Sequence, residues 1–321
     1  MPLVSVIVPV RDGERHLRAA LASVTGQTLT DLEVLVVDDG STDSTAAIVD
    51  ELAAADRRVR RLAGPATGSA GDARNTALAQ ARGDYLAFLD ADDRFAPTLL
   101  ADLHARAVAD RAEIVITGFR VDEGLGEPRP VDWGLRLDHF PAHPPVPAAE
   151  LGDHLFLATN PAPWNKLFRA DFVSANGYRF QSLRRVNDLL FTYSALAGAH
   201  RISHLPGYGV DYRVGHPGSL QSTLHEAPLD FVAALDALRD QLLRTGQWPR
   251  LERALTNLVV ETALTALRKA RTPQSFSVVH QALVGDVFPR HGVTGRPDGY
   301  FLRPRFAGEV DAIVTLDTPS L

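Results

Sequence analysis

The sequence predicts an α/β fold in which helices flank a doubly wound, mainly parallel but mixed sheet, followed by a C-terminal helical appendage. Over the first 121 residues, apolar runs rich in β-branched residues alternate with segments that carry apolar residues at helical spacing. Beyond Glu226 only the helical spacing persists. The chain has 321 residues, of which 45% are hydrophobic and 22% charged, so it is large enough to bury a sizeable core and is neither disordered nor fibrous.

The alternation defines the elements of the first half of the chain. The run 3–10 is nearly continuous in apolar residues, which is typical of a strand buried on both faces of a parallel sheet. The next segment carries Leu17, Leu21 and Val24 on one helical face. In order, we expect a strand at 3–10, a helix at 14–25, a strand at 32–37, a helix capped by Ser41 or Asp43, a strand at 59–62, a helix at 70–81, a strand at 85–89, a helix opened by Pro97 and a strand at 113–121.

Glycines, prolines and basic residues mark the limits of these elements. Gly83 is expected to end the helix at 70–81 in the left-handed conformation that helix C-termini favour. Proline, glycine, histidine and charged residues crowd the segment 122–163, which we interpret as a long loop over the sheet. The C-terminal helical pattern ends in the basic residues Arg268, Lys269 and Arg271. Their charge suits the C-terminus of a helix packed on its own domain, and contact with an anionic membrane surface is the alternative.

Composition excludes several classes of function. Lys and Arg number 33 against 39 Asp and Glu, and the formal net charge of −6 argues against a nucleic-acid binder. The absence of cysteine excludes disulfides, thiolate metal sites and a cysteine nucleophile. The N-terminus lacks the pattern of a signal peptide, and no apolar run approaches the roughly 18 residues of a membrane span, so we expect a cytoplasmic protein.

Acidic residues follow two of the predicted strands. Asp38 and Asp39 come at the end of the second strand, and Asp90, Asp92 and Asp93 follow the fourth. Because ligands bind beyond the carboxyl ends of parallel strands, these acids concentrate negative charge where a ligand is expected. Carboxylates suit Mg²⁺ or Mn²⁺, which take their other ligands from phosphates and water. We therefore predict a metal-assisted site at this edge, and we expect Asp93 to cap the following helix instead.

Four segments, in this order, resemble the successive signatures of the family-two glycosyltransferases, which are inverting enzymes with the GT-A fold. They are VSVIVPV at 4–10, VDDGSTD at 37–43, ARN at 73–75 and FLDADD at 88–93. The resemblance covers about residues 3–220. It implies a GT-A catalytic domain over 1–222, with a nucleotide-sugar half at about 1–121 and an acceptor half at about 150–222, and a mainly helical C-terminal region over 223–321.

The resemblance implies transfer of a sugar from a nucleoside diphosphate, most often UDP, to a hydroxyl of a glycan, teichoic acid or lipid-linked acceptor. By position, Asp39 would bond the base or ribose, Arg74 would hold the base and Asp90 would lie against the ribose. Asp92, the second acid of the Asp-x-Asp motif, would bind the Mn²⁺ or Mg²⁺ that bridges the diphosphate. The expected nucleotide-sugar site is completed by Pro9, Val10 and Ala91.

Asp188 is the candidate general base, which removes the proton from the attacking acceptor hydroxyl. The segment RVNDLLF at 185–191 resembles the acidic pair that precedes a helix in the family, with Asn187 in place of the usual Glu. An aspartate that only caps the helix is the alternative interpretation. Upstream, Trp164, Asn165 and Lys166 resemble a segment that precedes the acceptor site in polymer-building members, where Trp164 is either a sugar-stacking platform or core.

Two further segments complete the expected site. The segment 212–219 resembles a loop that closes over the diphosphate in relatives, so Arg213 and Ser219 would pair with phosphate oxygens. In the same segment His216 would be a metal ligand or a phosphate donor. Arg11 follows the first strand where many relatives have an aromatic residue, and it is the candidate that stacks on the base in its place.

Three other functions remain open. A dinucleotide-dependent enzyme is disfavoured because the turn 10–14 lacks the glycine triplet that admits a pyrophosphate. The presence of Asp92 and Asp188 disfavours a catalytically silent scaffold that binds sugar nucleotides or glycans, and a nucleotidyltransferase fits the paired acidic motifs less well. We further expect synthesis of a surface polymer, peripheral contact with the inner face of the plasma membrane and a homo-oligomer formed through the helical C-terminus.

Overall fold

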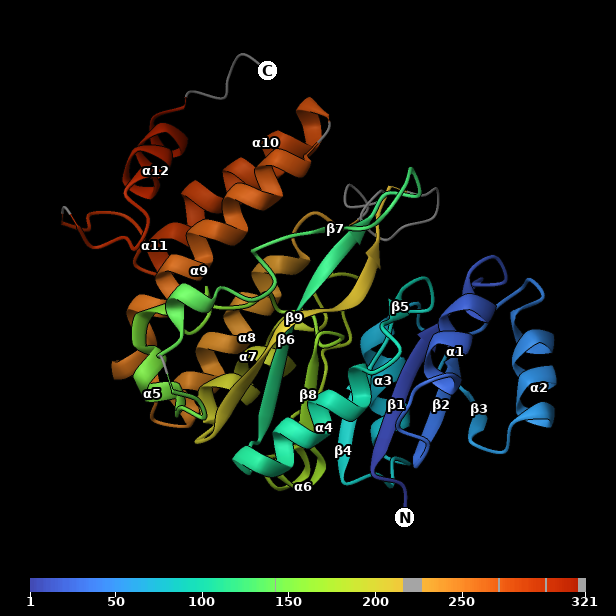
Figure 1. Cartoon of the computed structure of the whole chain (residues 1–321). Helices are drawn as coiled ribbons and strands as arrows, with labels where there is room; N and C mark the ends of the chain where they lie inside the picture. Colours follow the sequence, from blue (N-terminus) through green and yellow to red (C-terminus); the bar gives the residue numbers. More distant parts are fainter. Residues whose placement is uncertain (142, 216–226, 271, 298, 317–321) are drawn as a thin grey trace.

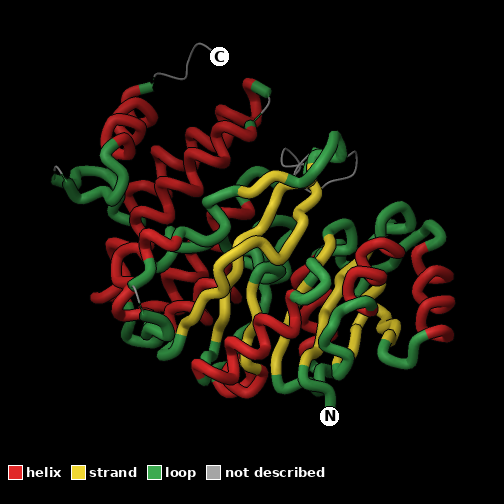
Figure 2. Tube along the Cα trace, viewed as in Figure 1, coloured by secondary structure: helices red, strands yellow, loops and turns green. Residues whose placement is uncertain are grey.

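The computed structural model describes all residues except 142, 216–226, 271, 298 and 317–321. A nine-stranded mixed sheet runs through the middle of the molecule in the order β3-β2-β1-β4-β8-β6-β9-β5, with β7 paired to β6 (Figures 1 and 2). Its N-terminal part is parallel and confirms the first four predicted strands within one residue at each end. These strands are β1 (Val4–Val10), β2 (Leu32–Asp38), β3 (Val59–Ala63) and β4 (Tyr85–Phe88).

The other part of the sheet is mixed. β8 runs antiparallel to both β4 and β6, whereas β6 and β9 are parallel. The strand predicted at 113–121 is confirmed as β6, but β8 and β9 were not expected, because β8 has only four residues and glycine and proline interrupt β9. The remaining strands are β5 (Arg94–Phe95), β6 (Ile114–Asp122), β7 (Arg129–Pro130), β8 (Lys166–Arg169) and β9 (Ile202–Arg213).

Helices cover both faces of the sheet, as expected for a doubly wound fold. On β1, Val6 and Val8 belong to the hydrophobic cluster under one layer of helices, whereas Ile7 belongs to the cluster on the opposite face. The first layer consists of α1 (Leu17–Thr25), α2 (Thr45–Ala55) and α4 (Leu99–Asp110), and the second includes α3 (Ala70–Leu78), α6 (Ala170–Ala175) and α7 (Leu189–Gly198).

The C-terminal region is helical, as predicted, and packs beside α7 (Figure 1). Leu238 of α8 and Leu255 of α9 are fully buried in the same hydrophobic cluster as Phe191 of α7. No helix within the described ranges is long and apolar enough to cross a membrane. The helices of this region are α8 (Asp230–Arg244), α9 (Trp248–Lys269), α10 (Pro273–Ala282), α11 (Phe288–Arg290) and α12 (Arg305–Thr315), with a π-helical turn at Leu283–Val287.

Three predictions about helix ends are wrong. Helix α2 begins at Thr45 with Ser44 as its N-cap, not Ser41 or Asp43. Gly83 does not end α3, which stops at Leu78 with Ala79 as its C-cap. A Cβ at Gly83 would lie 2.5 Å from the backbone nitrogen of Ser5, so glycine is needed there for close approach of two segments. Asp93 does not cap the following helix either, because α4 begins at Leu99 with Thr98 as its N-cap.

The predicted loop at 122–163 is mostly irregular but holds short elements: β7, α5 (Ala148–Leu151) and the 3₁₀ turns Leu137–His139 and Gly152–His154.

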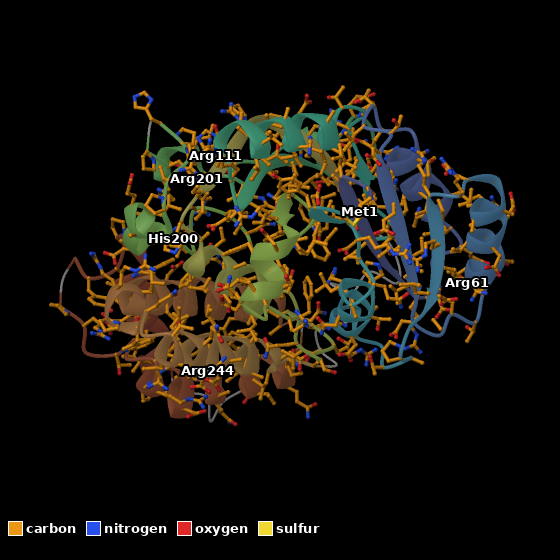
Figure 3. The ribbon with its side chains drawn as sticks, turned by 90° about the horizontal axis from the view of Figure 1, so that it is seen from below. Met1, Arg61, Arg111, His200, Arg201 and Arg244 are labelled. Carbon is orange, nitrogen blue, oxygen red and sulfur yellow. The ribbon has the colours of Figure 1, made fainter. Side chains whose placement is uncertain are left out.

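At the opposite end of the sheet from the acidic turns, Arg111, His200 and Arg201 lie close together, far from Arg61 on β3 (Figure 3). There Arg201 Nε donates to the Asp110 carbonyl at 2.8 Å, which ties the start of β9 to the end of α4.

Candidate active site

Asp39 follows β2 and is buried at the edge of the sheet. Its backbone N–H donates to the Val10 carbonyl at 2.9 Å, and its Oδ2 accepts from the Gly68 N–H at 2.8 Å. Its other oxygen, Oδ1, is buried with no hydrogen-bond partner among the described residues. A Cβ at Gly64 would lie 3.0 Å from Oδ1, so glycine keeps space beside it. A buried carboxylate oxygen without a donor is costly, so Oδ1 is a candidate acceptor for a donor group of a bound ligand.

The turn after β1 is fastened to the turn after β2. Asp12 has a φ of +51° and its Oδ1 accepts from the Thr42 N–H at 2.7 Å, while its own N–H donates to Ser41 Oγ at 2.9 Å. A Cβ at Gly68 would lie 3.0 Å from Arg11 Nη1, so the half-exposed guanidinium lies over the backbone that holds Asp39. This position is compatible with the expectation that Arg11 stacks on a bound base.

Three carboxylates gather after β4. Asp93 is buried, and its Oδ1 accepts from the Arg213 N–H at 2.8 Å while its Oδ2 has no partner among the described residues. Burial and the neighbouring charges of Asp92 and Asp90 raise the pKa of Asp93 well above its usual range. Arg213 Nη2 pairs with Asp122 at 3.1 Å, and its Nε donates to the Asp92 carbonyl at 3.3 Å. The turn therefore brings together carboxylates that disfavour each other's ionisation, and a bound cation would offset this repulsion.

This acidic turn fits a Mg²⁺ or Mn²⁺ ion that is shared with a substrate. Within the described ranges, no three His, Asp or Glu side chains form a complete set of metal ligands. Such ions commonly take one or two protein carboxylates and complete their shell with phosphate oxygens and water, so one or two carboxylates of the turn would suffice to hold the ion. His216 and Ser219, the other predicted contacts to the metal or the diphosphate, lie outside the described residues.

Arg74 joins the nucleotide side of the site to the segment of the candidate base. Its buried guanidinium donates from Nη2 to Asp90 Oδ1 at 2.6 Å and from Nη1 to Asn187 Oδ1 at 2.8 Å. The same group lies over the Phe180 ring, 5.3 Å from its centroid. Because both Nη atoms bond protein groups, Arg74 holds Asp90 and Asn187 in place. A direct contact between Arg74 and the nucleotide base stays a prediction.

Asp188 is the N-cap residue of α7, but its side chain makes no capping hydrogen bond to that helix. Burial raises the pKa of Asp188, and the positive charge of Arg74 opposes this shift. Asp188 as a whole residue is partly exposed, although its carboxylate lies among dense protein atoms. A carboxylate with a raised pKa in a partly exposed residue has the properties of a general base.

The segment that carries Asp188 is held by helix α3. Asn75 donates from Nδ2 to the Phe180 carbonyl at 2.9 Å and accepts from the Phe180 N–H at 3.0 Å, while Ser69 Oγ donates to the Leu183 carbonyl at 2.8 Å. A Cβ at Gly71 would lie 2.2 Å from the Gln181 carbonyl oxygen, so only glycine permits this approach. Val186 has a φ of +52°, a strained value for a β-branched residue, two residues before Asp188.

Trp164, Asn165 and Lys166 are buried, so none of them presents a surface to an acceptor. The Trp164 ring stacks on Tyr212 at 5.0 Å, which makes it core and not a platform. Asn165 Nδ2 donates to the Thr117 carbonyl at 2.7 Å, and Lys166 Nζ donates to the Ala162 carbonyl and to Asn165 Oδ1, both at 2.8 Å. These three residues support the site from inside the protein.

Comparisons with known proteins identify the family of the chain. Residues 5–155 match Glycosyl transferase family 2. The chain is 30% identical over 285 residues to the succinoglycan biosynthesis protein ExoO of Rhizobium meliloti (strain 1021), which covers 88% of this chain and 78% of ExoO. The chain belongs to the family-2 glycosyltransferases.

Two further matches place this family-2 chain among its relatives. It is 28% identical over 217 residues to EpsH of Bacillus subtilis (strain 168), covering 66% of the chain and 61% of EpsH. The crystal structure of Staphylococcus aureus TarS 1–349 in complex with UDP-GlcNAc superposes with a TM-score of 0.57 at 21% identity, covering 91% of this chain and 90% of that one. The predicted GT-A fold is thereby confirmed. The chain spans only part of its curated relatives: the matches cover from 40% to 66% of the length of three of them, of which EpsH is one.

Some residues of this family-2 site were missed or assigned another role from sequence. Gly64 and Gly71, which leave room for Asp39 and for the Asp188 segment, gave no signal beyond being glycines. Asn75 stood in the ARN segment but received no role, because its partner Phe180 is 105 residues away. Of the predicted nucleotide contacts, Pro9 and Val10 lie at the end of β1, and Ala91 lies in the turn between Asp90 and Asp92.

Proposed function

We propose that the chain is an inverting glycosyltransferase that moves a sugar from a nucleoside diphosphate to the hydroxyl of a glycan, teichoic acid or lipid-linked acceptor. The nucleotide of the donor is expected to be UDP. The observation that carries the proposal is the pairing, through Arg74, of the acidic turn at Asp90 with the Asn187–Asp188 segment. A ligand-binding edge and a candidate base are thus held together as one unit. The names of relatives such as TarS, a poly(ribitol-phosphate) β-N-acetylglucosaminyltransferase, support the class of reaction.

Each residue near the donor has a role in this proposal. The buried, unpartnered Oδ1 of Asp39 accepts a hydrogen bond from the base or ribose, and Asp90, oriented by Arg74, lies against the ribose. The backbone of Pro9, Val10 and Ala91 lines the donor pocket, and Arg11 stacks on the base. Arg213, whose guanidinium bonds the Asp92 carbonyl, is a cation beside the acidic turn and pairs with phosphate oxygens when a donor is bound.

Asp188 acts as the general base. The acceptor oxygen attacks the anomeric carbon, its proton passes to a carboxylate oxygen of Asp188, and the bond between that carbon and the diphosphate oxygen breaks. Asp92 would hold a Mn²⁺ or Mg²⁺ ion, which supplies Lewis-acid stabilisation of the charge on the leaving diphosphate. We also propose a cytoplasmic location with peripheral membrane contact, which a lipid-linked acceptor would require. The same proposal includes assembly of the chain into a homo-oligomer.

The proposal is tested by hydrolysis of UDP-linked sugars, in which water replaces the unidentified acceptor. We expect Asp188→Asn to lower the rate of hydrolysis about 10²- to 10⁴-fold, because the base is lost. UDP affinity, measured by isothermal titration, should stay within about twofold. Thr265→Ala, an exposed change on α9, serves as the control and should leave both values unaltered. Wild-type turnover in Asp188→Asn would contradict the role of the base, and UDP binding without hydrolysis by the wild type would favour the silent scaffold.

A further inference from the structure

Two cavities of about 670 and 780 Å³ lie between the segment 129–139, strand β9 and Lys269, Leu302 and Arg303 of the C-terminal region. Val131, Asp132 and Tyr208 line both cavities, so the two adjoin. We call this feature the 131–208 groove. Cavities of this size are typical of sites for small organic ligands.

Tyr208 is directed into the 131–208 groove by an irregularity between β6 and β9. The register between these strands shifts on both sides of Gly118, which pairs with Tyr208. A Cβ at Gly118 would lie 3.1 Å from Tyr208 Cδ1 and 2.6 Å from the Gly207 carbonyl oxygen, so the ring lies directly over the glycine. Tyr208 as a whole residue is 49% exposed. Bulges of this kind often redirect one side chain at a functional site.

Trp133 is a second exposed ring held in place at the same groove. A Cβ at Gly134 would lie 2.1 Å from the Phe119 ring, so only glycine lets the chain pass over that ring. The indole then packs edge-on against Phe119 at 4.5 Å and stays 40% exposed. Aromatic rings that are fixed at their base and exposed on one face offer an apolar surface to the C–H face of a sugar ring.

The charges that line the groove nearly balance. Glu123 pairs with Arg129 at 3.0 Å, and Arg303 pairs with Glu261 at 2.6 Å. His139 stacks on His154 at 4.4 Å, and burial lowers the pKa of His139, which keeps its imidazole neutral. The other charged lining residues are two carboxylates and two cations: Asp132, Asp138, Arg136 and Lys269. Such a lining supplies donors and acceptors for hydroxyl groups without the excess positive charge that a polyanion requires.

One end of the groove approaches the proposed catalytic carboxylates. Tyr212 lines the second cavity, and burial together with the charges of Asp93, Asp90, Asp92 and Asp188 raises the pKa of its hydroxyl. The residue after it, Arg213, contacts both Asp92 and Asp93 through hydrogen bonds. A chain bound along the groove would therefore have one end directed toward the acidic turn.

We propose that the 131–208 groove binds an uncharged oligosaccharide, the acceptor of the transfer, by stacking sugar rings on Trp133 and Tyr208. Only the identification of the bound saccharide as the acceptor rests on the proposed transferase function. The binding of a saccharide by the groove is a property that is measured without any donor.

The test is an array of uncharged oligosaccharides of glucose, galactose and N-acetylglucosamine, with poly(ribitol phosphate) as the anionic comparison. We expect the wild type to bind at least one uncharged oligosaccharide, and Trp133→Ala and Tyr208→Ala to bind it about tenfold more weakly in titration. Tyr208→Phe keeps the ring and should retain most of the affinity. Leu243→Ala, at a 45% exposed position on α8, is the control and should bind as the wild type does.

Three results would overturn the inference: no binding of any uncharged oligosaccharide, binding of poly(ribitol phosphate) alone, or wild-type affinity in both alanine variants. UDP affinity is measured in every variant and should not change, which also verifies that the variants are folded. Absence of UDP binding in the wild type would instead count against the proposed function, so the two failures are distinguishable.

Discussion

At the scale of single residues, the site depends on carboxylates whose environments differ. Asp39 and Asp93 each keep one buried oxygen without a partner in the described structure, whereas both Asp90 and Asn187 accept hydrogen bonds from Arg74. A neutral amide at position 187 leaves the charge of Arg74 to act on Asp90 and Asp188. Asp39, Asp90 and Asp93 were identified because they follow predicted strands, and Arg74 and Asn187 through the resemblance of their segments to the family. The sequence could not reveal that Arg74 joins Asp90 and Asn187, since Asn187 is 113 residues away.

The raised pKa of Asp188 predicts the acidic limb of the pH profile. A base must be ionised, and burial raises its pKa above the ordinary 3.8, so kcat/KM for hydrolysis of a UDP-linked sugar should fall as the pH is lowered through a value above 3.8. Arg74 lowers this pKa, so Arg74→Met should move the limb to higher pH, whereas Arg74→Lys should move it less. An identical limb in the wild type and in Arg74→Met would contradict this assignment.

At the scale of elements, α3 connects the two halves of the site. The helix was predicted from its sequence pattern, but its contacts with the segment 180–188 are made by polar atoms and by Gly71, which leave no periodic signal. The same limit explains the misassignment of Gly83, where close approach to Ser5, and not a helix end, requires glycine. Hydrophobic periodicity finds the strands and helices, whereas contacts between distant segments depend on the tertiary structure.

We predict that Asn75→Ala lowers the free energy of unfolding by about 1–3 kcal/mol, because the N–H and carbonyl of Phe180 both lose their partner. Urea denaturation followed by circular dichroism measures this change. Thr76→Ala is the matched control, since the Thr76 hydroxyl bonds only the Asp72 carbonyl of its own helix. Equal stability of the two variants would show that α3 does not hold the segment through Asn75.

At the scale of the whole molecule, the predicted boundary near residue 222 divides a hydrophobic cluster that the two parts share. Leu255 of α9 and Phe191 of α7 belong to this cluster, although the helical pattern alone suggested an appendage. Sequence periodicity gives the buried face of a helix but not the element against which it packs. The mixed sheet was predicted, but its strands β8 and β9 were missed for a similar reason, because β8 is short and β9 is interrupted by Gly207 and Gly209.

The shared cluster predicts that the chain unfolds in one transition. Trp164 reports on the sheet and Trp248 on the C-terminal helices, and the third tryptophan, Trp133, is replaced by Phe in both reporters. Variants that retain only Trp164 or only Trp248 should each give a fluorescence transition in urea that coincides with the loss of circular dichroism. A separate transition for Trp248 at lower urea would indicate that the C-terminal helices form an independent domain.

The central claim is that the acidic turns at the ends of β2 and β4 bind a nucleoside diphosphate together with a divalent ion. The most direct measurement is isothermal titration of the wild type and of Asp92→Asn with UDP, GDP, CDP and dTDP, each with and without Mn²⁺. Exposed Asp50→Asn on α2 serves as the control. We predict that one nucleotide, UDP, binds tightly only with Mn²⁺, that Asp92→Asn loses this dependence and that Asp50→Asn retains it. Failure of all four nucleotides to bind the wild type, or unaltered Mn²⁺-dependent binding by Asp92→Asn, would contradict the claim.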